Sequence, residues 1–257
     1  MSSATARANC HFSRTRDRSG CETKGVYVES LSTIQKVAVW IVPVLLAITV
    51  HETAHGWIAK QFGDRTAMML GRLTLNPIKH IDPVGTLLLP LLMLMMGGFV
   101  FGWAKPVPVT WENLRNPKRD MAFVALAGPL ANLAMALMWL FIIKLGLWLV
   151  AGAPAVAEPV VYMGVAGVVI NIVLMVLNLV PLPPLDGGRV VVSLLPNKLS
   201  WRYSRIEPYG MWIILALFFT GMLGMILWPF IRGVETVLCY VGQIPVEMFE
   251  RIVRLIS

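Results

Sequence analysis

Charged side chains are scarce in this sequence. Asp, Glu, Lys and Arg make up 14% of the 257 residues, whereas soluble domains contain roughly 25%. Hydrophobic residues make up 57%, so a soluble globular protein is excluded. Crossing a bilayer takes about 20 apolar residues, and several windows meet that length. Four contain no charge (83–104, 121–143, 159–185 and 208–231), and a fifth span, about 34–58, contains one short polar motif.

These spans predict an all-α polytopic membrane protein with about four to six membrane segments. Its loops are too short to hold a separate folded domain. Residues 1–33 are rich in Ser, Thr and Arg, so we expect a disordered tail there. We expect one membrane domain over 34–231. Residues 232–257 are expected to form an amphipathic segment at the membrane surface.

Cysteine and histidine are also rare. The three cysteines, Cys10, Cys21 and Cys239, form no C-x-x-C pair, so neither a disulfide framework nor a cysteine metal site is expected. Only four histidines are present. A metal-ion transporter would repeat its ligands on several helices or carry a His-rich loop, so this alternative function is disfavoured.

The net charge of +8 comes from basic residues spread over the loops. Charge of this kind is a topology signal, and no nucleic-acid partner is expected. Loops 60–82, 105–120 and 186–207 each contain four Lys or Arg and two acids. The positive-inside rule places all three in the cytoplasm, which requires 83–104 to form a re-entrant hairpin; a plain transmembrane helix is the alternative. Five Lys or Arg in the tail oppose this orientation, which stays open.

The polar motif inside the first span is HETAH, at positions 51–55. Ionisable groups at membrane depth are costly and usually functional. In H-E-x-x-H on a helix, the two imidazoles lie one turn apart on one face and can hold Zn²⁺, with Glu52 beside the reacting water. His51 and His55 are therefore candidate ligands and Glu52 a candidate general base. A structural metal site or a packing role is the alternative.

A catalytic zinc site normally has a third protein ligand. Asp186 is the best candidate, because it follows the uncharged span 159–185 in the string NLVPLPPLDGGR. The prolines of this string end the helix, and Gly187 and Gly188 permit a close approach to a neighbour. The alternative for Asp186 is a turn-forming residue before two glycines. His80 is expected at the surface, with a fourth-ligand role as its alternative.

Three motifs together resemble the site-2 protease family of intramembrane zinc metalloproteases: HETAH, GPLAN at 128–132, and NLVPLPPLDGG. The strings FGWAKPVPV (101–109) and LNPIKHIDPVG (75–85) are similar to the compact subgroup without PDZ or CBS domains. The resemblance implies that 34–231 is an intramembrane metalloprotease domain in the cell (inner) membrane. It implies zinc held by His51, His55 and Asp186, with Glu52 as the general base. Substrates would be membrane proteins cut in or beside a transmembrane helix within the lipid bilayer.

The resemblance also suggests roles for polar and small residues near the site. Asn178 matches an Asn that is a candidate to stabilise the oxyanion, and a helix-end hydrogen bond is its alternative. Gly128 and Asn132 lie one turn apart and could admit a substrate or the catalytic helices. For Asn132 a helix–helix contact is the alternative, and for Asn171 it is the expectation.

Segment 66–82 alternates apolar and polar residues, which predicts a short β-hairpin beside the site. Its exposed edge could bind an unwound substrate by strand addition. An inactive relative that only binds membrane helices is a further alternative function. The intact Glu52 argues against it, because a binder needs no base.

Overall fold

The computed structural model describes residues 31–82, 85, 88 and 105–257. Within these ranges the chain forms helices and turns and contains no strand, which confirms the predicted all-α class. The predicted tail over 1–33 and the predicted hairpin or helix over 83–104 lie almost wholly outside the described residues.

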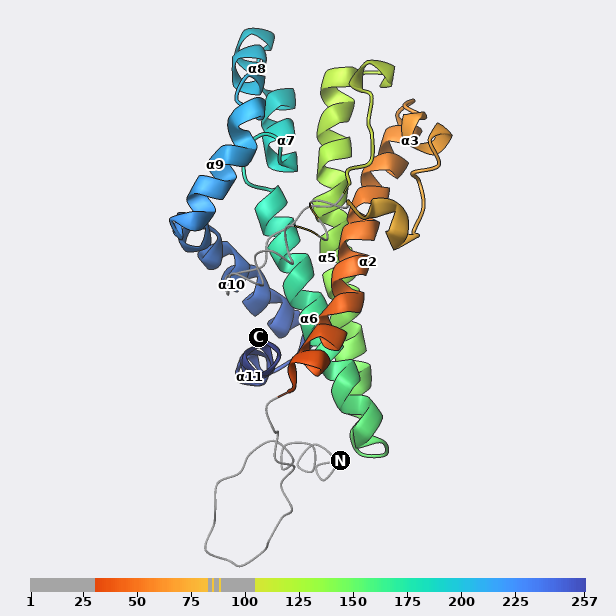
Figure 1. The fold of residues 1–257 in the computed structure, drawn as a ribbon, viewed down its shortest axis with the longest axis vertical. Coiled ribbons are helices and arrows are strands. Elements are labelled where there is room, and N and C mark those ends of the chain that lie inside the picture. Colours follow the sequence, from red (N-terminus) through yellow and green to blue (C-terminus); the bar gives the residue numbers. More distant parts are fainter. Residues whose placement is uncertain (1–30, 83–84, 86–87, 89–104) are drawn as a thin grey trace, which may run out of the picture.

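Three long helices pack against one another and form the centre of the molecule: α2 (Thr33–Gln61), α5 (Pro117–Leu149) and α6 (Pro154–Asn178) (Figure 1). They match three of the predicted spans. Helix α2 begins with a capping box, in which Ser32 and Gln35 each accept a hydrogen bond from the other's backbone N–H. Together with α10 (Met222–Gly242), they are the four helices among the described residues that are long and apolar enough to cross a membrane.

The predicted single span over 208–231 is wrong. The structure has two helices there, α9 (Glu207–Phe219) and α10, separated at Gly221. Gly221 has φ of 73°, a left-handed conformation that ends α9 and that glycine adopts without steric cost. The window lacked charge, but lack of charge does not report where a helix breaks. Helix α10 then continues past residue 231, so the segment 232–257 contains half of α10 as well as α11 (Val246–Ile256).

The predicted β-hairpin over 66–82 is also wrong. This segment forms a short helix, α3 (Thr66–Met69), and a 3-10 turn, η1 (Pro77–His80). The Asp64 carboxylate accepts hydrogen bonds from the backbone N–H and the hydroxyl of Thr66, and this favours a helical turn where a strand was expected. Gly71, with φ of 63°, then reverses the chain.

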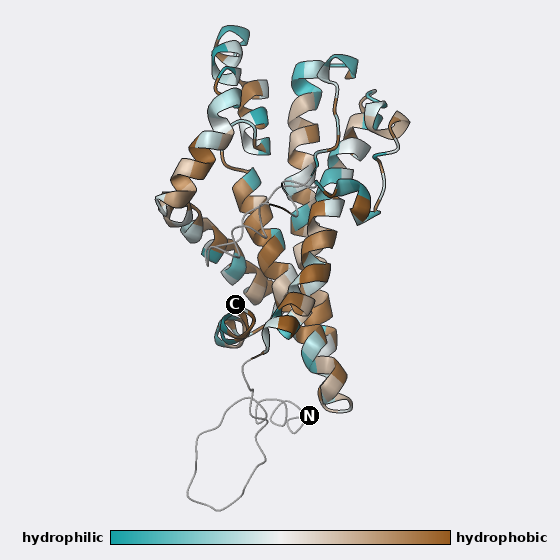
Figure 2. Cartoon of the chain, viewed as in Figure 1, coloured by the Kyte–Doolittle hydropathy of each residue, from teal (hydrophilic) through white to brown (hydrophobic). Residues whose placement is uncertain are grey.

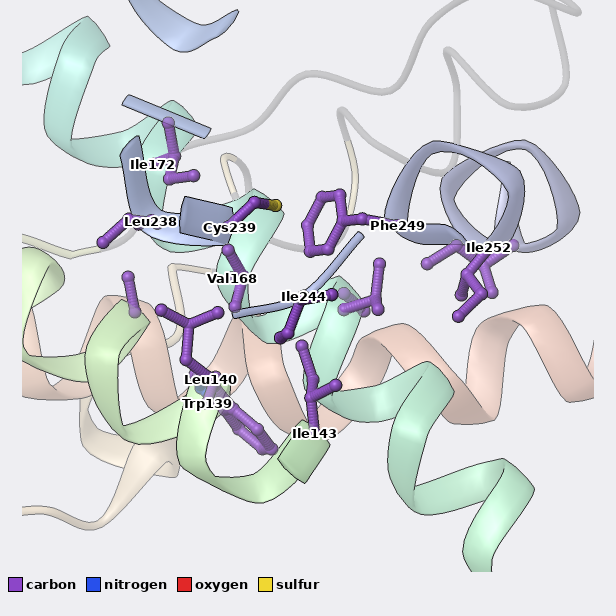
Figure 3. Packing of buried hydrophobic residues seen from close by; sticks show 14 of the residues in the cluster. Trp139, Leu140, Ile143, Val168, Ile172, Leu238, Cys239, Ile244, Phe249 and Ile252 are labelled. Carbon is purple, nitrogen blue, oxygen red and sulfur yellow. The ribbon is translucent and has the colours of Figure 1, made fainter. Parts of the chain in front are cut away.

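The core lies between α5 and α6, and α11 covers one side of it (Figure 3). Helix α11 is amphipathic, and its apolar residues Phe249, Ile252 and Ile256 are buried. The indole N–H of Trp40, on α2, donates to the backbone carbonyl of Ile256 (3.0 Å). The C-terminal helix therefore ties the first membrane helix to the bundle.

The three basic loops lie at one end of the molecule, opposite the α5–α6 turn (Figure 1). Several contacts join them. The Arg189 guanidinium of α7 (Asp186–Leu194) lies 5.3 Å from the Trp111 ring, and Arg72 donates to the Lys105 carbonyl (3.0 Å). The Thr110 backbone N–H donates to Asp64 (2.7 Å), and Lys118 donates to the Asn197 Oδ1 (2.9 Å). Trp111 belongs to a second 3-10 turn, η3 (Trp111–Asn113), and α8 (Asn197–Ser204) completes this end. Figure 2 shows that this end is hydrophilic while the long helices are largely apolar. The positive-inside rule predicts that the three basic loops lie on the same side of the membrane, and their common end of the molecule agrees with it.

Candidate metal centre

His51, His55 and Asp186 meet at one buried point. The two histidines project from one face of α2, and their Nε2 atoms lie 3.0 Å apart. The Asp186 Oδ2 atom lies 3.3 Å from each Nε2. One ligand atom from each of the three residues falls within 4.8 Å of the others. The structure thus brings together the three residues that the sequence singled out as ligands.

The loop between α6 and α7 determines where Asp186 lies. Helix α6 ends at Asn178, just before the proline-rich string, and Asp186 is the first residue of α7. A Cβ at Gly187 would lie 2.3 Å from the Leu179 carbonyl oxygen, and a Cβ at Gly188 would lie 2.2 Å from the backbone nitrogen of Pro183. Only glycine fits at these two positions. The close return of α7 onto its own loop sets the Asp186 carboxylate against the histidines.

The three side chains suit a cation. Each histidine uses Nδ1 for a hydrogen bond: His55 to the Val124 carbonyl oxygen (2.7 Å) and His51 to the Asn132 Oδ1 (2.5 Å). A carbonyl oxygen only accepts, so Nδ1 of His55 carries the proton and its Nε2 presents a lone pair. The Asp186 Oδ2 is buried and has no hydrogen-bond partner.

One face of α5 supports both imidazoles. Val124, Gly128 and Asn132 recur every four residues, so they lie on the same side of this helix. A Cβ at Gly128 would lie 2.4 Å from the His55 Nε2 and 2.6 Å from the His51 Nε2. The missing side chain at 128 therefore leaves room for both rings. Gly128 and Asn132, which were expected to be substrate or packing residues, both lie against the histidines.

Glu52 lies next to His51 but outside the cluster. Its Oε2 accepts a hydrogen bond from the backbone N–H of Val107 (2.7 Å). This contact was not predicted, because a backbone amide has no residue-type signature. The same is true of the Val124 carbonyl that holds His55.

Two other candidates, Asn178 and His80, make hydrogen bonds to backbone carbonyls. The Asn178 side-chain amide donates to the Leu174 carbonyl one turn earlier in its own helix (3.0 Å), a helix-end hydrogen bond of the kind weighed as its alternative. His80 is buried, not at the surface as expected, and its Nε2 bonds the Thr74 carbonyl (2.9 Å). His80 does not belong to the ligand cluster.

Comparison with known proteins gives one family. Residues 39–151 and 146–221 match the family described as "Peptidase family M50". The chain is 36% identical over 197 residues to "Putative zinc metalloprotease YwhC" of Bacillus subtilis, covering 75% of this chain and 85% of that protein. It is 30% identical over 228 residues to "Putative zinc metalloprotease Rip2" of Mycolicibacterium smegmatis, covering 84% of each chain. It is 29% identical over 221 residues to the Mycobacterium tuberculosis protein of the same name, covering 82% of this chain and 79% of that one. No solved structure matches the chain.

Proposed function

The chain belongs to peptidase family M50, the site-2 protease family, and from this premise we propose that it is a zinc-dependent intramembrane endopeptidase. Its substrates are membrane proteins, cut at peptide bonds within or next to a transmembrane helix. We assign the protease domain to 34–231 and the protein to the cell membrane, with the three basic loops in the cytoplasm. Within 232–257, the amphipathic helix α11 completes the bundle.

One observation carries this proposal: three buried ligand atoms converge, and the Val124 carbonyl holds the His55 proton on Nδ1, away from them. Two imidazole nitrogens and a carboxylate oxygen lie within 3.3 Å of one another. Such an arrangement of lone pairs and negative charge is unfavourable without a cation. Two His and one carboxylate form a ligand set of catalytic zinc sites, which leave a fourth position for water or substrate.

His51, His55 and Asp186 would hold the zinc ion. When bound, zinc polarises the scissile carbonyl and makes water a nucleophile at neutral pH. Glu52 is adjacent to a ligand without being one, as a general base must be. It takes the proton of the attacking water as the new C–O bond forms, and then delivers this proton to the leaving amine nitrogen as the peptide C–N bond breaks.

The Val107 amide keeps the Glu52 carboxylate in place by donating to its Oε2. This hydrogen bond stabilises the negative charge of the Glu52 carboxylate and fixes the orientation of the carboxylate before water is bound. Asn178 stays our candidate for the oxyanion donor. Its amide would leave the Leu174 carbonyl and turn to the substrate.

The surroundings of the site indicate a substrate that enters from the membrane. His51 and His55 lie within a helix that is apolar and long enough to cross the bilayer, and both are buried. Among the residues that the structure describes, this is the one cluster of three or more metal-binding side chains. A metal-ion transporter needs several such ligand groups along a path, so a single cluster favours a catalytic metal site over a transport pathway.

The test uses the purified full chain and its E52Q and D186N variants in detergent. We expect one zinc per wild-type chain, near-normal zinc in E52Q and strongly reduced zinc in D186N. A single-span membrane-protein reporter in the same detergent should be cut by the wild type only. Cleavage by E52Q would refute the base assignment, and a wild-type chain without zinc would refute the metal site.

A further inference from the structure

His51 lacks the direct backbone anchor that His55 has. Its Nδ1 lies 2.5 Å from the Asn132 Oδ1, and an amide side chain can present either oxygen or nitrogen to a neighbour. Asn132 alone therefore does not determine which nitrogen of His51 carries the proton. Zinc binding by Nε2 requires that proton on Nδ1.

The hydrogen bonds continue beyond Asn132. Its Nδ2 donates to the Asn171 Oδ1 on α6 (3.0 Å), and the Asn171 Nδ2 donates to the Gly167 carbonyl oxygen (2.8 Å). The chain of groups is His51, Asn132, Asn171 and the Gly167 carbonyl, which we name the asparagine relay. It links α2, α5 and α6. The two asparagines are at most 1% exposed.

The Gly167 carbonyl gives the relay its direction. A carbonyl oxygen only accepts, so Asn171 must turn its NH₂ group toward it and its Oδ1 toward Asn132. Asn132 must then turn its own NH₂ group toward Asn171 and its Oδ1 toward His51. Reversing both amides would set two acceptor oxygens against each other at Gly167, in a place that water does not reach.

We propose that Asn171 is a positioning residue of the metal centre. Through Asn132, it holds His51 in the tautomer whose Nε2 lone pair faces the zinc. His55 reaches the same tautomer directly through the Val124 carbonyl. The side-chain hydrogen bonds of Asn171 go to Asn132 and to the Gly167 carbonyl and not to a metal ligand, so it acts through the helix–helix contact expected of it. Burying two amides within apolar helices is costly unless all their hydrogen bonds are made, and the relay makes those bonds.

This inference rests on the zinc site proposed above, and its test is zinc affinity, measured by competition with a chelator on the purified full chain. We expect N171L to weaken zinc binding about 10-fold to 100-fold, as loss of such outer partners does. N171D should bind zinc nearly as the wild type does, because a protonated carboxyl group can donate to the Gly167 carbonyl and accept from Asn132. The matched control is I172A, at the next position in α6 and 1% exposed. It should lower thermal stability without changing zinc affinity.

A double-mutant cycle separates positioning from packing. In the N132D variant, an ionised carboxylate at position 132 can only accept, so it would hold the His51 Nδ1 proton without help from residue 171. We therefore expect N171L to weaken zinc binding in the Asn132 background and to have little effect in the N132D background. If N171L does not fold, N171A is the second disrupting variant, with the same expected cycle.

Three outcomes are distinguishable. Wild-type zinc affinity in folded N171L and N171A would overturn the relay while the zinc site stands. An equal loss in both backgrounds would overturn it too, since that loss would come from packing. A wild-type chain that binds no zinc would overturn the proposed function and the relay together.

Discussion

Replacing Gly128 by alanine tests the geometry of the metal centre most directly. The new methyl carbon would lie 2.4 Å from the His55 Nε2, whereas ordinary contact begins near 3.4 Å. The ring edge would have to retreat by the difference, about 1 Å. Zinc–ligand distances tolerate deviations of only about 0.2 Å.

The rings have little freedom to retreat. The far side of each imidazole is held by α5 itself, His55 by the Val124 carbonyl at 2.7 Å and His51 by Asn132 at 2.5 Å. Moving the rings away from residue 128 would therefore stretch these bonds. We expect G128A to weaken zinc binding at least about 100-fold, the upper end of the effect of disturbed outer partners, and to abolish cleavage.

Chelator competition gives the zinc affinity, and circular dichroism checks that the variant is folded. The matched control is G233A, a glycine-to-alanine change in helix α10 where a Cβ meets nothing within 4 Å. It should keep zinc binding and raise stability slightly, since alanine favours a helix by roughly 0.5–1 kcal/mol over glycine. A folded G128A chain with wild-type zinc affinity would refute the claim that this face of α5 supports the histidines.

Three further predictions concern the base, the loop and the C-terminal helix. V107P removes the N–H that holds Glu52, so we expect the cleavage rate to fall at least tenfold while zinc affinity is unchanged. V107A keeps the N–H and should retain most activity. An equal loss of activity in both variants would refute the role of the amide. Burial raises the pKa of Asp64, but hydrogen bonds from Thr66 and the 110–113 segment outweigh it and leave the pKa below its ordinary value. The stabilisation by Asp64 is therefore full above pH of about 4 and is lost as pH falls through the lower folded-state pKa. D64N should lower the melting temperature at pH 7 and leave it unchanged in strong acid. A difference in melting temperature between D64N and the wild type in strong acid would contradict this account. F249A empties a fully buried site and should lower the free energy of unfolding, measured by chemical denaturation, by about 3 kcal/mol. F230A, at a residue that is 62% exposed, should leave this free energy nearly unchanged. Similar decreases in both variants would show that α11 does not anchor the bundle.

Sequence patterns were informative where chemistry follows from spacing along one element. The i, i+4 spacing of His51 and His55 sets both rings on one face of any helix. The proline-rich string after Asn178 had to end its helix, because proline lacks the donor N–H. Uncharged windows located α5 and α6, and the apolar span around the HETAH motif located α2.

Patterns failed where a choice between local conformations depended on a neighbour. Alternating apolar residues over 66–82 fit a strand, but a strand needs a partner edge, and Asp64 stabilises a helical turn there instead. The absence of charge over 208–231 concealed the break at Gly221. The helix–helix contact expected of Asn171 is confirmed by its hydrogen bond with Asn132 of α5, but nothing in α6 alone shows that this contact leads to His51.

The sequence by itself determined that this protein is helical and membrane-embedded, and that it carries two histidines, a glutamate and an aspartate of the right kinds. Those properties depend on residue type and on spacing within one helix. Only the tertiary structure decided that Asp186 meets the histidines, that Gly128 makes room for them, and that backbone groups of Val107, Val124 and Gly167 direct the polar side chains. Backbone amides and carbonyls are the same in every residue, so their roles exist only once the helices have packed.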